Sequence, residues 1–480
     1  MKKTLLILIG LGTVLFGYSQ NKDELLREWN KMSKSKTDLY KVYNELKLGM
    51  FIHWGAYSTQ GGIWQGEKIP GLGEWIMYHA KIPREEYKEV CKKFNPIGFN
   101  AEDWVKLAKD AGMKYIVIMP KHHDGFAMYH TKFTDFNIYD FTPFKRDPIE
   151  EIYKACLKFD IRMGIYYSHS IDWMDGGDAG AAQFKKENPN YIDKYASNQF
   201  DPAPVSYADY IEKKAIPQMR ELLQKFPNLI EIWYDYPVKM NLQQSFEFYK
   251  LAYDFQPKCL VNSRVGNDLG DILTAGDNEI PTEINSKYNT WETPGTLNDT
   301  WGYKSYDNNW KSHKEMLFWI VEIASKGGNY LLNIGPDGNG VIPEESVNIL
   351  KGIGRWMKIN GEAIYGTRKW TTKKEGPTNI GMKSTEYRAE NKFDFCFTPE
   401  DLWFTAKDNY VYVISLTTQT RETVSVKSLF DYSKKITSIK ILGNNRALKW
   451  KTLGDKVDIT LPLNRKIDEY GFVLKVELND

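Results

Sequence analysis

Short apolar runs alternate along most of the chain with longer segments in which apolar residues return every three or four positions. The short runs predict buried strands and the longer segments predict amphipathic helices. Predicted strands occupy 48–53, 115–120, 160–167, 229–234, 259–264 and 327–334. Predicted helices occupy 23–46, 101–111, 148–159, 206–226, 241–255, 311–326 and 347–358. This alternation favours parallel strands joined by crossover helices.

The pattern predicts an α/β fold, a (β/α)8-like barrel with an irregular section. Fewer than eight strands stand out, and the stretch 271–300, rich in Asp, Asn, Thr and Gly, is expected to hide one or two weak ones. A long polar insertion at 172–203 follows the third strand, where such a loop shapes substrate access. From about 366 onward, short alternating segments separated by turn residues predict an antiparallel β-sandwich.

Three segments are expected along the chain. Residues 1–20 have the form of a signal peptide, with Lys2 and Lys3 before a short apolar stretch and a small-residue exit. Residues 21–365 would then form the barrel and residues 366–480 the C-terminal β-sandwich. Because no Cys lies near the exit and no later segment is apolar enough to span a bilayer, we expect an exported protein, periplasmic or secreted, without a membrane anchor.

Charge and cysteine content narrow the possible functions. The chain has 64 Lys and Arg against 62 Asp and Glu, a net charge of +2, which provides no electrostatic footprint for nucleic acid. The four cysteines form no C-x-x-C pair, so a zinc cluster is not expected. Cys156 and Cys259 lie in apolar segments and are expected to be free, buried thiols.

Polar and aromatic residues gather where the predicted strands end. Asp235 closes the apolar run that begins at Leu229, although strand interiors disfavour Asp. His53 and Trp54 follow the first strand, 121–125 (KHHDG) follows the second, and 166–168 (YYS) ends the third. Functional side chains at the carboxyl ends of several strands are typical of a (β/α)8 barrel active site.

Two carboxyl groups in such a site would suit hydrolysis at a sugar anomeric centre, one as nucleophile or base and the other as proton donor. Asp235 is the first candidate. The second candidate is Glu292, which lies beside Trp291, where partial desolvation would raise the pKa of the carboxyl. Glu279 and Glu283 are nearby competitors for the same role.

These motifs together resemble the retaining α-L-fucosidase family, whose members use an Asp nucleophile and are exo-acting. The resemblance rests on KLGMFIHWGAYS (48–58), GEW (73–75), KHHDGFAMY (121–129), GIYYS (164–168), IWYD (232–235), NSR (262–264), WET and WGY (291–293, 301–303) and SKGGNYLLNIGPDGNG (325–340). The motifs stand in family order over about residues 25–365. The resemblance implies a barrel followed by a β-sandwich domain, and fucosylated oligosaccharides or glycoconjugates as substrates.

The resemblance also implies roles for single residues. Asp235 matches the nucleophile and Glu292 matches the acid/base of members that carry the WET motif. The positions matching those that hold the fucose ring are His53, Glu74, Trp75, His122, His123, Tyr167 and Arg264. Imidazoles and a carboxylate suit a sugar that offers hydroxyls and no charge, and an aromatic wall suits its C6 methyl. Tyr166 and Tyr167 point to opposite faces of a strand, and Tyr167 is the preferred site residue.

Other interpretations also fit parts of the sequence. His122, His123 and Asp124 could bind a metal ion, but no further donor cluster at metal spacing accompanies them, so neither a metal nor a cofactor is expected. A barrel hydrolase for a related terminal sugar is the alternative enzyme. A sugar-binding protein that has lost catalysis would lack one carboxylate, whereas both candidates are present. The fucosyl linkage, the preferred leaving group and the oligomeric state stay open.

Overall fold

The computed structural model describes residues 22–176, 200–238, 240–282, 287–382, 396–417, 422–444, 446–462 and 470–479. The predicted signal peptide, most of the predicted insertion at 172–203 and Glu283 lie outside these ranges. Within them, no helix combines the length and apolar character needed to cross a bilayer.

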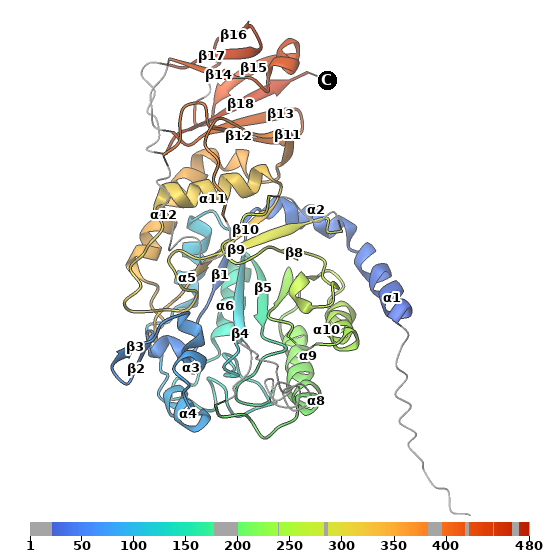
Figure 1. The fold of residues 1–480 in the computed structure, drawn as a ribbon, viewed down its shortest axis with the longest axis vertical. Helices are drawn as coiled ribbons and strands as arrows, with labels where there is room; N and C mark the ends of the chain where they lie inside the picture. Colours follow the sequence, from blue (N-terminus) through green and yellow to red (C-terminus); the bar gives the residue numbers. More distant parts are fainter. Residues whose placement is uncertain are drawn as a thin grey trace, which may run out of the picture.

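In the described part of the chain, eight parallel strands form one curled sheet in the order β7-β6-β5-β4-β1-β10-β9-β8 (Figure 1). The strands are β1 (Leu48–Ile52), β4 (Tyr115–Lys121), β5 (Arg162–Tyr167), β6 (Glu231–Tyr234), β7 (Leu260–Val261), β8 (Leu273–Thr274), β9 (Trp291–Gly295) and β10 (Asn329–Ile334). A bridge between Asn262 and Ile272 links the two edge strands. The predicted barrel is therefore confirmed, and its irregular section contains the two-residue strands β7 and β8, with β8 and β9 being the weak strands expected in 271–300.

Helices cover the outside of the sheet. They are α5 (Ala101–Asp110), α6 (Pro148–Phe159), α8 (Tyr207–Tyr210), the π-helical segment η3 (Ile211–Ala215), α9 (Ile216–Lys225), α10 (Leu242–Phe255), α11 (His313–Ser325), α12 (Glu344–Asn360) and the short η5 (Gly361–Ala363). Local signals fix several starts. Asn100 caps α5 by accepting from the backbone of Glu102, and Asn241 opens α10 in a capping box with Gln244.

The N-terminal part differs from the prediction in two places. The predicted helix 23–46 is two helices, α1 (Lys22–Lys34) and α2 (Thr37–Leu46), separated where buried Lys36 reaches Asp271 at 2.8 Å. The chain between β1 and β4 also forms short elements that periodicity did not predict. They are η1 (Ala56–Thr59), β2 (Ile63–Trp64), β3 (Glu67–Lys68), η2 (Gly73–Trp75), α3 (Ile76–His79) and α4 (Arg84–Lys92).

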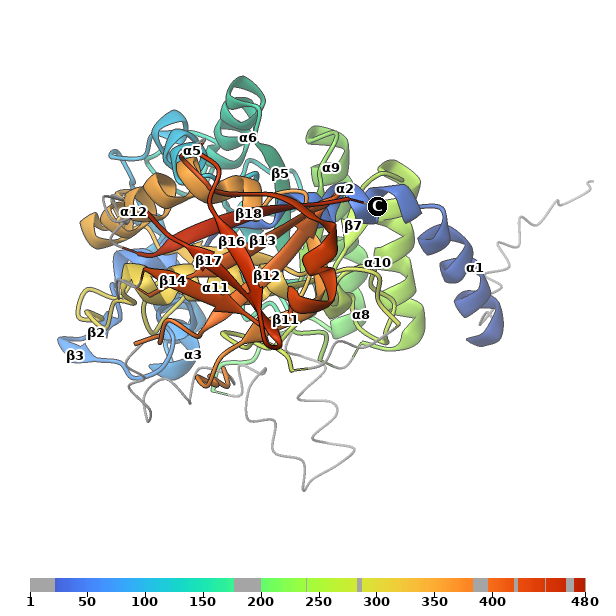
Figure 2. The ribbon, with the colours of Figure 1, turned by 90° about the horizontal axis from the view of Figure 1, so that it is seen from above.

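Two antiparallel sheets follow the barrel. A five-stranded sheet has the order β11-β12-β13-β18-β15 and a three-stranded sheet the order β14-β17-β16. Their strands are β11 (Arg368–Glu375), β12 (Leu402–Lys407), β13 (Tyr410–Ser415), β14 (Thr423–Val426), β15 (Ile436–Ile441), β16 (Trp450–Leu453), β17 (Lys456–Thr460) and β18 (Phe472–Leu478). The short segment η6 (Phe430–Lys435) lies between β14 and β15, and η4 (Ser263–Val265) follows β7 in the barrel. Trp403 donates to Glu322 of α11 at 2.5 Å, so this domain rests on the barrel through α11 (Figure 2). The predicted β-sandwich is thereby confirmed.

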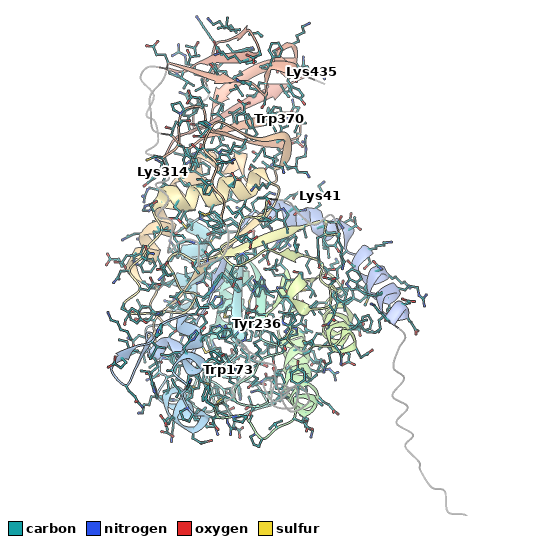
Figure 3. All side chains as sticks on the ribbon, viewed as in Figure 1. Lys41, Trp173, Tyr236, Lys314, Trp370 and Lys435 are labelled. Atoms are coloured by element: carbon teal, nitrogen blue, oxygen red, sulfur yellow. The ribbon has the colours of Figure 1, made fainter. Side chains whose placement is uncertain are left out.

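The carboxyl ends of the barrel strands lie on the side away from the C-terminal sheets. Tyr236, which follows β6, and Trp173, which follows β5, both lie in that part of the barrel (Figure 3). The residues at the strand ends therefore gather at one end of the barrel, where the active sites of this fold lie.

Candidate active site

A cavity of about 770 Å³ opens at the carboxyl ends of the barrel strands. Its wall is made by Phe51, His53, Gly71, Leu72, Glu74, Trp75, Tyr78, His79, His122, His123, Trp233, Asp235, Tyr236, Pro237, Arg264, Asp277 and Trp301. Most predicted site residues are in this wall, although they come from distant parts of the chain. The exceptions are Tyr167 and Glu292.

Asp235 is the centre of the polar contacts in the cavity. One carboxylate oxygen accepts from Arg264 at 2.8 Å, and the other accepts from the Tyr166 hydroxyl at 2.9 Å. His123 Nε2 stands 3.5 Å from that second oxygen. The carboxylate is thus fixed in position at the end of β6, and its side chain remains 12% exposed toward the cavity, as a group that attacks a substrate must be.

Arg264 holds a second carboxylate in the same cavity. Its other terminal nitrogen pairs with Asp277. Burial alone would lower the pKa of Arg264, but the charges of Asp277 and Asp235 outweigh burial and raise it. One guanidinium therefore bridges two carboxylates, and the Asp277 side chain, 37% exposed, is the more open of the two. Asp277 was not among the residues predicted from the sequence. The feature that could have indicated it is its position in the Asp-rich stretch that follows a weak strand.

Tyr166, and not Tyr167, is the tyrosine that β5 contributes to the site. The Tyr167 hydroxyl donates to Gln218 of α9 at 2.7 Å, on the opposite face of the strand from Asp235. The two residues alternate as a strand requires, so the error was in the choice of face. Tyr166 also packs against the site rings, with its ring stacked on His122 at a centroid distance of 5.4 Å.

Three histidines present neutral imidazoles to the cavity. Burial lowers the pKa of His53 to about 3 and, with neighbouring positive charges, takes the pKa values of His122 and His123 well below the usual range. His53 Nδ1 is 2.6 Å from Asn333 Oδ1, so this nitrogen carries the proton and Nε2 accepts. His122 Nδ1 has no hydrogen-bond partner among the described residues.

Glu74 is buried in the cavity wall beside Trp75. The backbone N–H of Gly302 donates to Glu74 Oε2 at 2.7 Å. Burial raises the pKa of Glu74 to about 7, and the negative charges of Asp277 and Asp235 act in the same direction. Glu74 can therefore exchange a hydrogen bond with a hydroxyl as donor or acceptor near neutral pH.

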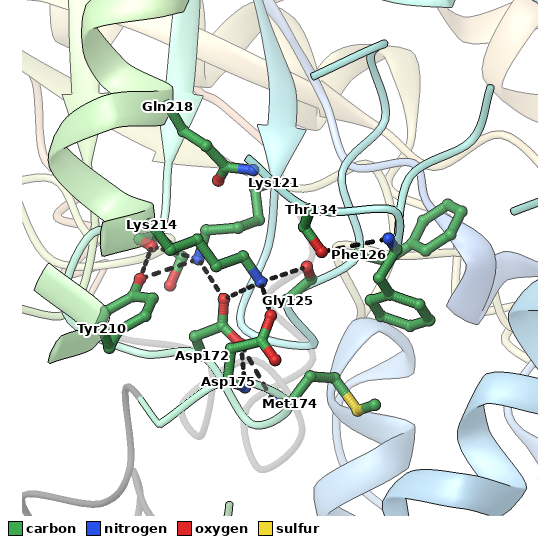
Figure 4. A network of polar contacts seen from close by, with 12 residues as sticks. Lys121, Gly125, Phe126, Thr134, Asp172, Met174, Asp175, Tyr210, Lys214 and Gln218 are labelled. Atoms are coloured by element: carbon green, nitrogen blue, oxygen red, sulfur yellow. Dashed lines mark hydrogen bonds and ion pairs between the residues drawn. The ribbon is translucent and has the colours of Figure 1, made fainter. Parts of the chain in front are cut away.

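A buried ionic network joins Lys121, at the end of β4, to Asp172 and Lys214 (Figure 4). Lys121 and Lys214 converge on Asp172, at 3.2 and 2.9 Å. The backbone N–H of Trp173 donates to the carbonyl of His123 at 2.8 Å, and His123 Nδ1 is 2.6 Å from Ser168 Oγ. Because Ser168 donates its own proton to Ile171, His123 Nδ1 is the donor in that contact. This fixes Nε2, the nitrogen nearer Asp235, as the acceptor.

Glu292 does not lie beside Asp235, contrary to the prediction. It is fully buried inside the barrel beneath Trp233, whose indole N–H donates to Glu292 Oε1 at 2.7 Å. The Tyr43 hydroxyl donates to Glu292 Oε2 at 2.7 Å and lies 2.9 Å from Glu231. Burial raises the pKa of Glu292 to about 7, while these hydrogen bonds oppose the increase. Burial and the neighbouring charge of Glu292 raise the pKa of Glu231 well above its usual range. Glu292 therefore holds the Trp233 indole in place.

This position predicts a mild effect of Glu292→Gln. Glutamine can still accept from Trp233, so kcat/KM should stay within about tenfold of the wild-type value for substrates with good or poor leaving groups. Glu292→Leu should lower stability by about 1–3 kcal/mol for each group left unpaired, measured by thermal unfolding. A 100-fold loss in Glu292→Gln confined to substrates with poor leaving groups would return the acid/base role to Glu292.

The remaining wall of the cavity is aromatic. Phe51 stands with its ring centroid 5.0 Å from Trp233 and 6.1 Å from Trp301. The Arg264 guanidinium lies 4.8 Å above the Trp233 ring. These rings form an apolar surface beside His53, whose ring centroid lies 4.6 Å from that of Phe51 and 5.0 Å from that of Trp301.

No group of three or more His, Cys, Asp or Glu side chains suited to a metal ion occurs in the described ranges. Metal independence stays a prediction, tested by activity after chelation. Cys156 and Cys259 are buried free thiols.

The chain resembles characterised proteins over most of its length. The family model for alpha-L-fucosidase matches residues 15–362, and the model for the alpha-L-fucosidase C-terminal domain matches residues 397–477. Human plasma alpha-L-fucosidase is 29% identical over 440 residues, 86% of this chain and 83% of the human protein. The crystal structure of alpha-L-fucosidase from Vibrio sp. strain EJY3 has a TM-score of 0.75 at 32% identity, covering 94% of this chain and 75% of that one. Lactobacillus casei AlfC, in complex with alpha-L-fucose product, has a TM-score of 0.61 at 35% identity, covering 68% and 99%.

Proposed function

We propose the catalytic residues of this chain, which belongs to the α-L-fucosidase family. Asp235 and Asp277 are the two catalytic carboxyls of a retaining exo-α-L-fucosidase. The observation that carries this assignment is the guanidinium of Arg264, which pairs with both carboxylates in one cavity. A retaining mechanism needs its two carboxyl groups about 5–5.5 Å apart. Two carboxylates on the two terminal nitrogens of one arginine are compatible with that spacing.

The reaction would proceed in two displacements. Asp235 attacks C1 of the fucose, the glycosidic bond breaks, and Asp277 gives its proton to the departing oxygen. The product of this step is a fucosyl ester of Asp235 with the opposite configuration at C1. Asp277, now a base, takes a proton from water as the water oxygen attacks C1, which releases fucose and restores both carboxyl groups.

The same cavity would recognise the fucose ring. The neutral imidazoles of His53, His122 and His123 and the carboxyl of Glu74 suit ring hydroxyls, because each can complete a hydrogen bond that the protein leaves open. The rings of Phe51, Trp233 and Trp301 suit the C6 methyl, since an apolar group next to aromatic carbon needs no polar partner. A cavity that surrounds one terminal sugar favours exo-action on fucosylated glycans.

An aryl α-L-galactoside tests this proposal, because that sugar differs from the matched fucoside by a hydroxyl at C6. A hydroxyl buried against the aromatic wall without a partner costs about 1–3 kcal/mol. We expect kcat/KM for the galactoside to be lower on the order of 10- to 100-fold, measured on one enzyme preparation. Equal values would contradict fucose selectivity and favour a barrel hydrolase for a related sugar.

A further inference from the structure

Tyr236 has a backbone conformation that bulky side chains rarely adopt. Its φ is +53°, in the left-handed region, where Cβ crowds the following carbonyl oxygen. The next residue is Pro237, and a residue before proline prefers an extended, negative φ. Conformations of this kind persist where the surrounding structure enforces them, and they gather at ligand-binding sites.

The turn that contains Tyr236 is held from two sides. The Val238 N–H donates to the Tyr236 carbonyl at 2.7 Å, and Ser170 donates to the Val238 carbonyl at 2.5 Å. On the other side, Pro237 packs so closely on Gly266 that a Cβ there would come within 2.8 Å of it. The loop after β5 and the loop after Arg264 therefore fix the turn, and they hold the Tyr236 side chain against the cavity.

The Tyr236 ring belongs to the partly exposed section of the cavity wall, here called the outer part. Its edge meets Trp75 at a centroid distance of 5.8 Å and an interplanar angle of 69°, and it meets His123 at 6.0 Å and 67°. The hydrogen-bonding residues of the inner part are buried. The residues that share the outer part with Tyr236 are at least partly exposed, namely Gly71, Leu72, Tyr78, His79 and Pro237. Because the inner part is closed and the outer part is partly exposed, a group attached to a fucose held in the inner part would extend through the outer part.

We propose that Tyr236 is a specificity-determining residue that binds the leaving saccharide, stacking its ring on the C–H face of a neutral sugar unit. The proposal rests on the fucosidase function proposed above, because it needs a fucose held against Asp235. The sugar is neutral since, among the described residues that line the cavity, Arg264 is the one Lys or Arg side chain, and two carboxylates already pair with it. The left-handed backbone of Tyr236 is the structural consequence of presenting a ring at this position.

Three variants separate the ring from the backbone strain. Tyr236→Phe keeps both, Tyr236→Ala removes the ring and keeps a Cβ at positive φ, and Tyr236→Gly removes both. Each is assayed with α-L-fucosyl fluoride, whose leaving group cannot reach the outer cavity. A panel of uncharged fucosylated oligosaccharides with α1,2, α1,3, α1,4 and α1,6 linkages is first tested on the wild type. Each variant is then also assayed with the oligosaccharide that the wild type cleaves fastest.

For Tyr236→Ala and Tyr236→Gly, we expect kcat/KM to fall on the order of tenfold with the oligosaccharide, the size of one lost stacking contact, and to stay within about twofold with the fluoride. Tyr236→Phe should retain both activities. Tyr236→Gly should melt at a higher temperature than Tyr236→Ala, because glycine accepts the positive φ.

Several results would overturn the proposal, each in a recognisable way. Unchanged oligosaccharide hydrolysis in the glycine and alanine variants would show that Tyr236 binds no leaving sugar. Equal losses of kcat/KM on both substrates would show that Tyr236 positions Asp235 and does not bind the leaving sugar. If the wild type hydrolyses the fluoride and none of the oligosaccharides, the proposed saccharide subsite is wrong and the proposed fucosidase function is unaffected. A wild type inactive on the fluoride would instead contradict the proposed function itself.

Discussion

Replacement of Asp235 by glycine is expected to lower kcat for an aryl α-L-fucoside by a factor on the order of 10³ or more. The glycosyl-enzyme ester cannot form without this carboxylate, and loss of a covalent step raises the barrier by several kcal/mol. Asp235 sits at the end of β6 with both oxygens hydrogen bonded, so its removal leaves Arg264 and Tyr166 with an open site for a small anion. Steady-state kinetics before and after addition of azide measure the effect.

The configuration of the azide product identifies the role of Asp235. Azide entering the space left by the carboxylate attacks C1 once, so the product should be β-L-fucosyl azide. Asp235→Asn is the matched control, since it keeps the volume of the side chain and blocks azide. If Asp235→Gly retained more than a few per cent of wild-type activity without azide, the nucleophile would be a different residue.

Replacement of Asp277 by glycine should give a loss that depends on the leaving group. Without a proton donor, substrates with poor leaving groups should slow by about 10²- to 10⁴-fold, the usual contribution of general acid catalysis. Substrates with a dinitrophenyl leaving group should slow less in the first step, because that oxygen departs without a proton. A series of aryl α-L-fucosides of graded leaving-group pKa measures this dependence.

Azide again separates the two roles. In Asp277→Gly, azide should attack the fucosyl ester of Asp235, and the product should be α-L-fucosyl azide, with retained configuration. Glu279→Gln serves as the control, because Glu279 lies two residues along the same loop and is not part of the cavity wall. A loss of activity in Glu279→Gln that depends on the leaving group, together with normal activity in Asp277→Gly, would move the acid/base role to Glu279.

The sequence predicts the barrel because each well-formed strand is a continuous apolar run, such as β4 or β10, that needs burial on both faces. It makes β7 too long, at 259–264, and does not locate β8, because strands of two residues have no periodicity to detect. The break between α1 and α2 was also missed, because it depends on Lys36 reaching Asp271, a contact across 235 residues that no local pattern contains.

The site residues on strand ends were predictable, whereas the depth of a side chain within the barrel was not. Glu231, Trp233 and Asp235 alternate along β6 and share one face, in successive layers. Glu292 is the second residue of β9, and it lies in the lower layer with Glu231 beneath Trp233. Asp235 and Glu292 both follow an aromatic residue, so the distinction between the two carboxyls comes from strand register alone. Register across parallel strands is a property of the closed sheet and not of either segment.

The most direct test of the account traps the covalent intermediate. A 2-deoxy-2-fluoro-α-L-fucosyl fluoride should inactivate the wild-type enzyme. The fluorine at C2 slows both displacements, whereas the reactive fluoride leaving group at C1 keeps the first one fast enough for the fucosyl ester to accumulate. Proteolysis and mass spectrometry of the inactivated protein should then place one fluorofucosyl group on the peptide that contains Asp235. A label on Asp277 or Glu292 in place of Asp235 would contradict the assignment of the nucleophile, and the account of the site would fail with it.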